Sequence, residues 1–133
     1  MFKYITLIIL FILTNSCSAA ITGKEKFIKS APYKYDGIVY ANYQKIARCY
    51  EVSENRPQAY GAQENMTIYN ELGLAEYQLG SQNVYYILIQ FQRISDNKTN
   101  VKAYFVDNLD YALRPFGEGP NAAWEIINNC GKE

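Results

Sequence analysis

The chain has 133 residues, of which 49% are hydrophobic and 20% charged, and this composition is typical of one globular domain rather than of a disordered chain. Thirteen lysines and arginines balance thirteen aspartates and glutamates, so the formal net charge is zero. A neutral chain lacks the basic surface that binds polyphosphate, which argues against a nucleic acid as partner.

The N-terminus has the order of a secretory signal peptide. Lys3 supplies one positive charge, the run from Tyr4 to Leu13 is apolar apart from Thr6, and residues 14–20 are small or polar. The apolar run is shorter than the ~20 residues that a membrane-spanning helix needs. We therefore expect residues 1–20 to be a signal peptide and the protein to be exported to the cell envelope, the periplasm or the medium.

Two processing routes are compatible with this leader. Ordinary cleavage after Ala20 fits the small residues at its end, whereas Cys17 resembles the lipid-carrying cysteine of a lipoprotein box and would become the first residue. Membrane contact is expected only through a lipid on Cys17. Residues 21–35 are polar and lysine-bearing, so we expect a flexible tether there, ahead of a single globular domain at 36–131.

The cysteine count indicates one disulfide. Of the three cysteines, Cys17 is either lipidated or removed, which leaves Cys49 and Cys130 to pair in an oxidising compartment. Two thiols without any histidine do not complete a tetrahedral zinc site. The pair is therefore expected to be structural, and neither a metal nor a cofactor is expected.

The first patterned segment predicts a helix. Asp36 is a suitable N-cap, and the helix should end near Ser53, before Pro57. Apolar residues then recur at helical spacing: Val39, Tyr43, Ile46, Ala47 and Tyr50.

The middle of the chain predicts strands. Met66–Leu79 is interrupted by Gly73, which fits two short strands or one bent strand. Val84–Ile94 is the clearest strand, and a turn rich in Asp and Asn joins it to a second strand, Val101–Asp107, as an antiparallel hairpin. The alternation assigns two faces to the first of these, with Tyr85, Ile87, Ile89 and Phe91 on one and Tyr86, Leu88, Gln90 and Gln92 on the other.

Pro120 suits the first turn of a C-terminal helix whose apolar stripe includes Ile127 and Cys130. The expected fold is a small α+β domain with an N-terminal helix, an antiparallel sheet of three or four strands and a C-terminal helix. Both helices should cover one face of the sheet, joined by the Cys49–Cys130 disulfide.

Few residues offer catalytic chemistry. The lack of histidine removes Ser-His-Asp and Cys-His arrangements, and no glycine-rich phosphate loop is present. An acidic group near the C-terminus could supply the two carboxylates of a glycosidase: Asp107, Asp110, Glu118 and Glu125. Because such residues are usually just solvated, we expect no enzyme, with a small carboxylate-based hydrolase of cell-wall glycans as an alternative.

The 13 tyrosines are the strongest positive signal. They favour strands and pack with a wet hydroxyl, but they also anchor protein interfaces. As a partner-binding surface the sequence favours Tyr86 and Tyr104, with Gln90 and Gln92 beside them. The expected function is a non-catalytic binding or scaffold module that recognises an envelope protein or glycan, and the alternative is a secreted effector or inhibitor of a foreign protein.

Overall fold

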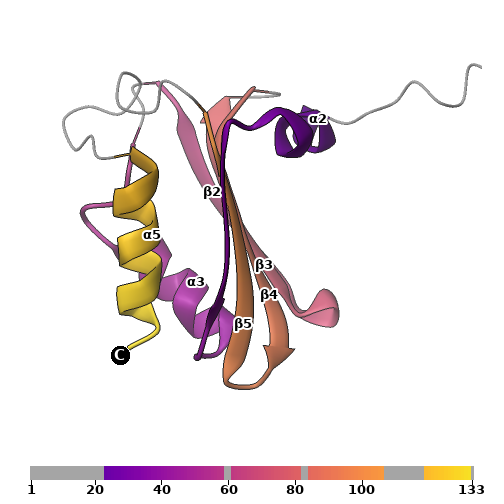
Figure 1. Ribbon diagram of the computed structural model, residues 1–133, viewed down its shortest axis with the longest axis vertical. Coiled ribbons are helices and arrows are strands. Elements are labelled where there is room, and N and C mark those ends of the chain that lie inside the picture. The colour runs from indigo at the N-terminus through magenta and orange to yellow at the C-terminus, as the bar shows by residue number, and fades with distance from the viewer. Residues whose placement is uncertain (1–22, 59–60, 82–83, 107–118, 133) are drawn as a thin grey trace, which may run out of the picture.

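The computed structural model describes residues 23–58, 61–81, 84–106 and 119–132. These residues form one antiparallel sheet of five strands with helices on both of its faces (Figure 1). The strands are β1 (Tyr33–Val39), β2 (Gln63–Tyr69), β3 (Leu74–Ser81), β4 (Val84–Ser95) and β5 (Lys98–Phe105), in the order β1-β5-β4-β3-β2. The helices are α2 (Gly23–Ser30), α3 (Tyr43–Val52) and α5 (Gly119–Cys130), with a short 3-10 turn at Asn70–Leu72.

The predicted α+β fold is confirmed, with one strand more than expected. α3 and α5 pack on one face of the sheet, and α2 lies on the other (Figure 1). The main core fills the space between the sheet and helices α3 and α5. Its largest fully buried side chains are Tyr50, Tyr77, Phe91, Phe105, Ile46, Leu79, Ile87, Ile89 and Ile127.

The disulfide joins the two helices that share a sheet face, as predicted. Cys49 near the end of α3 bonds to Cys130 at the end of α5, with their Cα atoms 5.7 Å apart. None of the described helices is long and apolar enough to cross a membrane.

The predicted start of the first helix is wrong. Asp36 lies in β1 opposite Lys102, and the helix begins at Tyr43, where the side chain of Asn42 accepts hydrogen bonds from the backbone of Gln44 and Lys45. Val39 is buried in the same core as the apolar residues of α3, because it is the last core-facing residue of β1. In the sequence it therefore looked like the first apolar residue of the helix, although it belongs to a strand.

The expectation of a flexible tether over residues 21–35 is also wrong for the part that the structure describes. Residues 23–30 form α2, and β1 begins at Tyr33 and pairs with β5 along its whole length. Lys24 binds Glu76 on the sheet, and the ring of Phe27 stacks on Tyr85 at 5.6 Å. These two contacts hold α2, a lysine-rich helix with little apolar surface of its own, against the sheet.

Of the two readings of Met66–Leu79, two separate strands is the one observed. β2 and β3 form a hairpin around the 3-10 turn, and Gly73 closes that turn in the left-handed conformation with φ 59°. The predicted hairpin of β4 and β5 is confirmed as well.

A bulge in β4 changes which face each of its first tyrosines occupies. Leu79 of β3 lies opposite Ile87, but the next residue, Gly80, lies opposite Tyr85, so Tyr86 is the extra residue. The predicted assignment of side chains to the two faces of β4 is correct from Ile87 onward and is reversed for Tyr85 and Tyr86. Tyr86 therefore packs against the main core, while Tyr85 lies on the opposite face under α2.

Candidate functional site

An open groove of about 690 Å³ lies between α3 and the edge strand β2. Its volume is within the range of ~300–1,000 Å³ that is usual for ligand sites. It is lined by polar and basic residues of α3 and its cap and by apolar residues of β2: Asn42, Gln44, Lys45, Arg48, Met66, Ile68 and Asn70.

The helical and strand periodicities together build this groove. In α3, Ile46, Ala47 and Tyr50 turn into the core, which leaves Lys45 and Arg48 on the exposed side of the helix. In β2, Met66 and Ile68 point to the helix face of the sheet and pack partly against the core. The groove thus has an apolar floor from the strand and a basic wall from the helix.

One end of the groove is closed by hydrogen bonds. Gln44 Nε2 donates to Asn70 Oδ1 at 2.7 Å and to the hydroxyl of Tyr43 at 3.1 Å. The first of these bonds ties the start of α3 to the 3-10 turn that follows β2.

The groove carries positive charge. Arg48 pairs with Glu51 at 3.1 Å, whereas the ammonium group of Lys45 has no ion-pair partner among the described residues. None of the described residues that line the groove is acidic. Because both basic groups are close to solvent, they attract an anionic ligand without the desolvation cost of a buried charge.

β2 also offers backbone groups. It is at one end of the sheet and pairs with β3 only, so within the described part of the chain its outer edge has no strand beside it. Unpaired N–H and C=O groups on such an edge can bind an added strand. The groove therefore combines a strand edge, an apolar floor and positive charge.

A second polar cluster lies on the opposite face of the sheet. Glu76 is only 1% exposed, and its carboxylate accepts hydrogen bonds from Lys24 at 2.6 Å, Gln90 at 3.0 Å and Gln78 at 3.1 Å. Burial alone would raise the pKa of Glu76, but these hydrogen bonds outweigh it and hold the pKa below its ordinary value. Glu76 is thus an ionised anchor for α2.

The residues predicted as a partner-binding surface are not brought together. Tyr104 lies opposite Leu88 on the α2 face of the sheet, and Gln90 and Gln92 follow on the same face, but Tyr86 packs on the other. The two amides already have partners inside the protein, because Gln90 binds Glu76, and Gln92 donates to the carbonyls of Leu72 and Gly73. A small hollow of about 170 Å³ opens beside Gln90 and Gln92.

The acidic residues of the hydrolase alternative are not assembled by the described structure. Asp107, Asp110 and Glu118 lie outside the described residues, as does Cys17. Glu125 is exposed on α5. Among the described residues, no group of three or more acidic, cysteine or histidine side chains is placed to hold a metal ion.

Two of the buried tyrosines of the core, Tyr50 and Tyr77, also offer no proton chemistry near neutral pH. The rings of Tyr50 and Tyr77 meet edge to face at 4.9 Å, and both are almost fully buried. Burial raises the pKa of each hydroxyl above the ordinary value of tyrosine, and the neighbouring Tyr77 and Glu64 add to the shift for Tyr50 and Tyr77, respectively. Both hydroxyls remain protonated.

The groove was not predicted from the sequence, although the residues that line it follow simple patterns in the sequence. Lys45 and Arg48 are three residues apart on the polar side of α3, and Met66 and Ile68 alternate in β2. Local periodicity assigns each side chain to a face but does not say which helix lies beside which strand. No protein-family model matches this chain, and no curated protein or solved structure is significantly similar to it.

Proposed function

We propose that the protein is an exported, non-catalytic binding module of the cell envelope, and that the groove between α3 and β2 holds an extended, acidic segment of a partner protein. The observation that carries the proposal is the coincidence of an open strand edge with a basic helix wall. Main-chain hydrogen bonds along β2 would supply affinity, and Lys45 and Arg48 would select acidic side chains.

Export is supported by the leader-like residues 1–20 and by the disulfide, since such bonds persist in oxidising compartments. Cys17 would carry a lipid if the protein is anchored, and it would be lost if cleavage follows Ala20. The intact mass of the processed protein distinguishes these products. A lipid-modified chain beginning at Cys17 supports an anchored module, whereas a chain beginning at Ile21 in the medium supports the alternative of a secreted effector or inhibitor.

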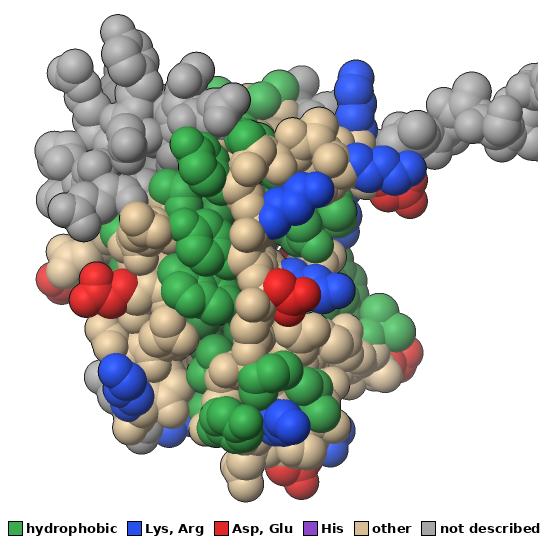
Figure 2. Space-filling model, in the orientation of Figure 1, with side chains coloured by type: hydrophobic (Ala, Val, Ile, Leu, Met, Phe, Trp, Pro, Cys, Tyr) green, Lys and Arg blue, Asp and Glu red, His purple; other side chains and the backbone are tan. Residues whose placement is uncertain are grey.

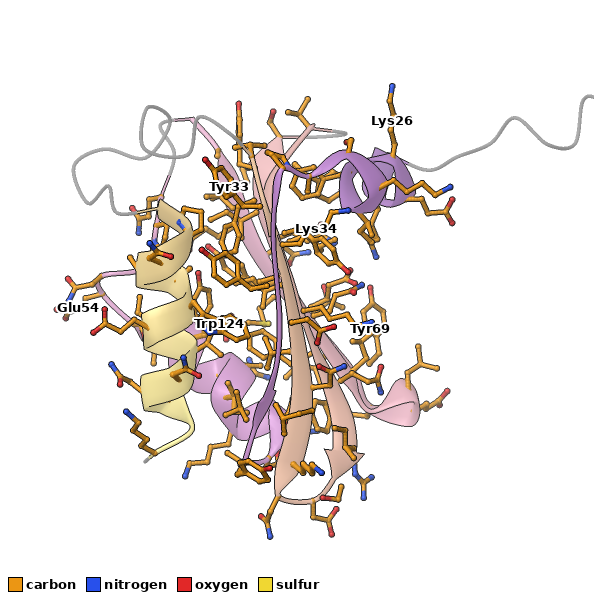
Figure 3. The ribbon with its side chains drawn as sticks, viewed as in Figure 1. Lys26, Tyr33, Lys34, Glu54, Tyr69 and Trp124 are labelled. Carbon is orange, nitrogen blue, oxygen red and sulfur yellow. A yellow bond between two sulfur atoms is a disulfide. The ribbon has the colours of Figure 1, made fainter. Side chains whose placement is uncertain are left out.

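Binding in the groove is tested with synthetic peptides that alternate acidic and apolar residues. We expect such a peptide to bind the processed protein, and we expect a version with lysine in place of each acidic residue to bind at least about tenfold more weakly. The substitutions Lys45→Glu and Arg48→Glu should each weaken binding of the acidic peptide. Lys26→Glu is the matched control, because Lys26 is an exposed lysine on α2, on the other face of the sheet (Figure 3).

Peptide analogues test whether the backbone of β2 takes part. Methylation of alternate peptide nitrogens removes the donors that face one strand, so one set of positions should abolish binding and the other should leave it unchanged. Equal binding by all analogues, or equal loss with Lys45→Glu and Lys26→Glu, would contradict recognition in this groove.

A photoreactive residue placed at Met66 of the full-length protein tests the same site in cells. Since Met66 lines the groove, we expect a discrete crosslinked product there. Glu125 on α5 is the control position. Addition of Lys45→Glu should remove the product from Met66, and a product that persists would count against the proposal.

A further inference from the structure

β1 is the edge strand at the end of the sheet opposite to β2, and it differs from β2 in the side chains that it presents. β1 pairs with β5 through seven consecutive residues without a bulge, and among the described residues no strand lies along its other edge. It contains no proline, so every one of its residues keeps its N–H group. Figure 2 shows this edge as a column of backbone between hydrophobic side chains on one side and charged side chains on the other.

The hydrophobic side of β1 is aromatic. Tyr35 stacks on Trp124 of α5, with 5.5 Å between the ring centroids, and its hydroxyl donates to Asn121 Oδ1 at 2.7 Å. Tyr33 is 45% exposed at the start of the strand. Tyr33 and Trp124 lie on the same side of the ribbon, away from Lys34 (Figure 3).

The other side of β1 carries one positive and one negative charge. Lys34 and Asp36 are two residues apart, so both point to the α2 face of the sheet, and both are exposed. The ammonium group of Lys34 donates to the carbonyl of Lys29 at 3.2 Å, which uses one of its three hydrogens. The carboxylate of Asp36 forms no ion pair within the described part of the chain, and Asp36 sits opposite Lys102 of β5.

We infer that β1 binds β1 of a second copy of this chain, antiparallel and centred on Tyr35, so that Lys34 of each copy lies opposite Asp36 of the other. In this register residue numbers that face each other add up to 70, so the two Tyr35 side chains meet and Tyr33 faces Gly37. Two unlike charge pairs form at once, related by the two-fold axis. The result is one sheet of ten strands, five from each copy.

The charges select this register over its neighbours. A shift that centres the pairing on Asp36 places the two carboxylates opposite each other, and a shift that centres it on Lys34 places the two ammonium groups opposite each other. Like charges directly across a strand pair are destabilising. Charged residues on an edge strand normally discourage pairing with another strand. Here they destabilise only the pairings centred on Lys34 or on Asp36.

The strand at the other end of the sheet lacks this self-complementarity. On the α2 face β2 presents Gln63, Asn65, Thr67 and Tyr69, none of which is charged. On the helix face its one charged residue, Glu64, is already bound to Arg56. Pairing between two copies of β2 would gain no charge contact, so the second copy is assigned to β1.

Charge exchange provides the test. In sedimentation velocity on the processed protein we expect a reversible dimer that weakens as salt is added. Lys34→Asp alone and Asp36→Lys alone should each weaken the dimer by about tenfold or more, because each substitution converts both charge pairs into like pairs. The double variant Lys34→Asp/Asp36→Lys should restore the dimer.

A mixture of the two single variants separates charge pairing from loss of fold. The Lys34→Asp chain then presents two acids and the Asp36→Lys chain two bases, so an equimolar mixture should form the mixed dimer although neither variant dimerises alone. A mixture that stays monomeric would overturn the inference. So would a dimer of the original protein that both single variants keep at full strength.

Hydrogen exchange of the unaltered protein gives a reading that does not depend on any variant. The outer amides of residues 33–37, which overlap in this register, should exchange more slowly as the protein concentration rises, whereas those of β2 should not change. The inference fails if the protein is monomeric up to about 1 mM, because a dimer weaker than that contributes less than ~4 kcal/mol of binding free energy. It also fails if protection in β1 does not depend on concentration.

Discussion

The indole ring of Trp124 occupies the space that a side chain at position 37 would need. A Cβ atom added to Gly37 would lie 2.8 Å from Cζ2 of Trp124 and 3.1 Å from Cη2. Glycine is unfavourable in the middle of a strand, but here it allows α5 to approach β1 closely. This contact, together with the stack of Tyr35 on the same indole, sets the position of α5 against the edge of the sheet.

Gly37→Ala is therefore expected to destabilise the protein by about 1–3 kcal/mol, because the rigid indole has to move. A smaller ring at the other position should relieve the clash. In the double variant Gly37→Ala/Trp124→Phe the loss should be smaller than the sum of the two single losses, as measured by urea unfolding. Strictly additive losses would mean that the two residues do not compete for the same space.

Removal of the disulfide is expected to cost roughly 4 kcal/mol. Cys49 and Cys130 are 81 residues apart, so the bond restricts most of the unfolded chain. The comparison is between the original protein and Cys49→Ser/Cys130→Ser in urea at equilibrium, with the intact mass as a check that two hydrogens are lost on oxidation. If the variant unfolds at the same urea concentration, the bond does not stabilise the fold.

The ion pair of Lys24 and Glu76 predicts a pH-dependent stability. Because hydrogen bonds hold the pKa of Glu76 below its ordinary value of 4.5, its contribution is complete above that pH and is lost as pH falls through the lower folded value. Lys24→Ala should destabilise the protein by about 1–3 kcal/mol near neutral pH. The difference from the original protein should shrink in urea titrations below about pH 4.

Lys26→Ala is the control for that prediction, since Lys26 is an exposed lysine of the same helix and forms no ion pair in the described structure. It should leave the unfolding curve nearly unchanged at both pH values. A loss with Lys24→Ala that is equally large at low pH would show that packing, rather than charge, accounts for it.

The bulge in β4 predicts different outcomes for two tyrosines that the sequence grouped together. Tyr86→Ala should cost about 2 kcal/mol, because the ring packs partly against the main core. Tyr104→Ala should cost less than about 1 kcal/mol, since Tyr104 lies outside that core. Thermal unfolding of both variants under one set of conditions decides the matter, and equal losses would contradict the assigned faces.

Patterns that involve one element at a time were predictable from the sequence. The alternation of Ile87, Ile89 and Phe91 identified a core face, and the pairing of Cys49 with Cys130 followed from the cysteine count. The spacing of Ile46, Ala47 and Tyr50 identified the buried side of α3. In each case burial on one side only leaves a direct periodic signal.

Features that depend on a distant partner were not predictable. β1 contains Asp36 and Gly37, which disfavour strands, and it is a strand because all seven residues pair with β5. The bulge at Tyr86 left no trace, because the residues around it are apolar on both faces. The α3–β2 groove required the helix and strand to be placed side by side, which no local pattern gives.

The disulfide divides the chain into a closed ring and an open arm. Cys49 and Cys130 enclose β2, β3, β4, β5 and α5 in the ring, whereas α2 and β1 precede Cys49 and are held only by noncovalent contacts. Tension applied at the N-terminal end therefore peels off α2 first and then unzips β1 from β5. The same pull also unwinds α3 as far as Arg48, and with it the basic wall of the groove, before it meets a covalent stop at Cys49.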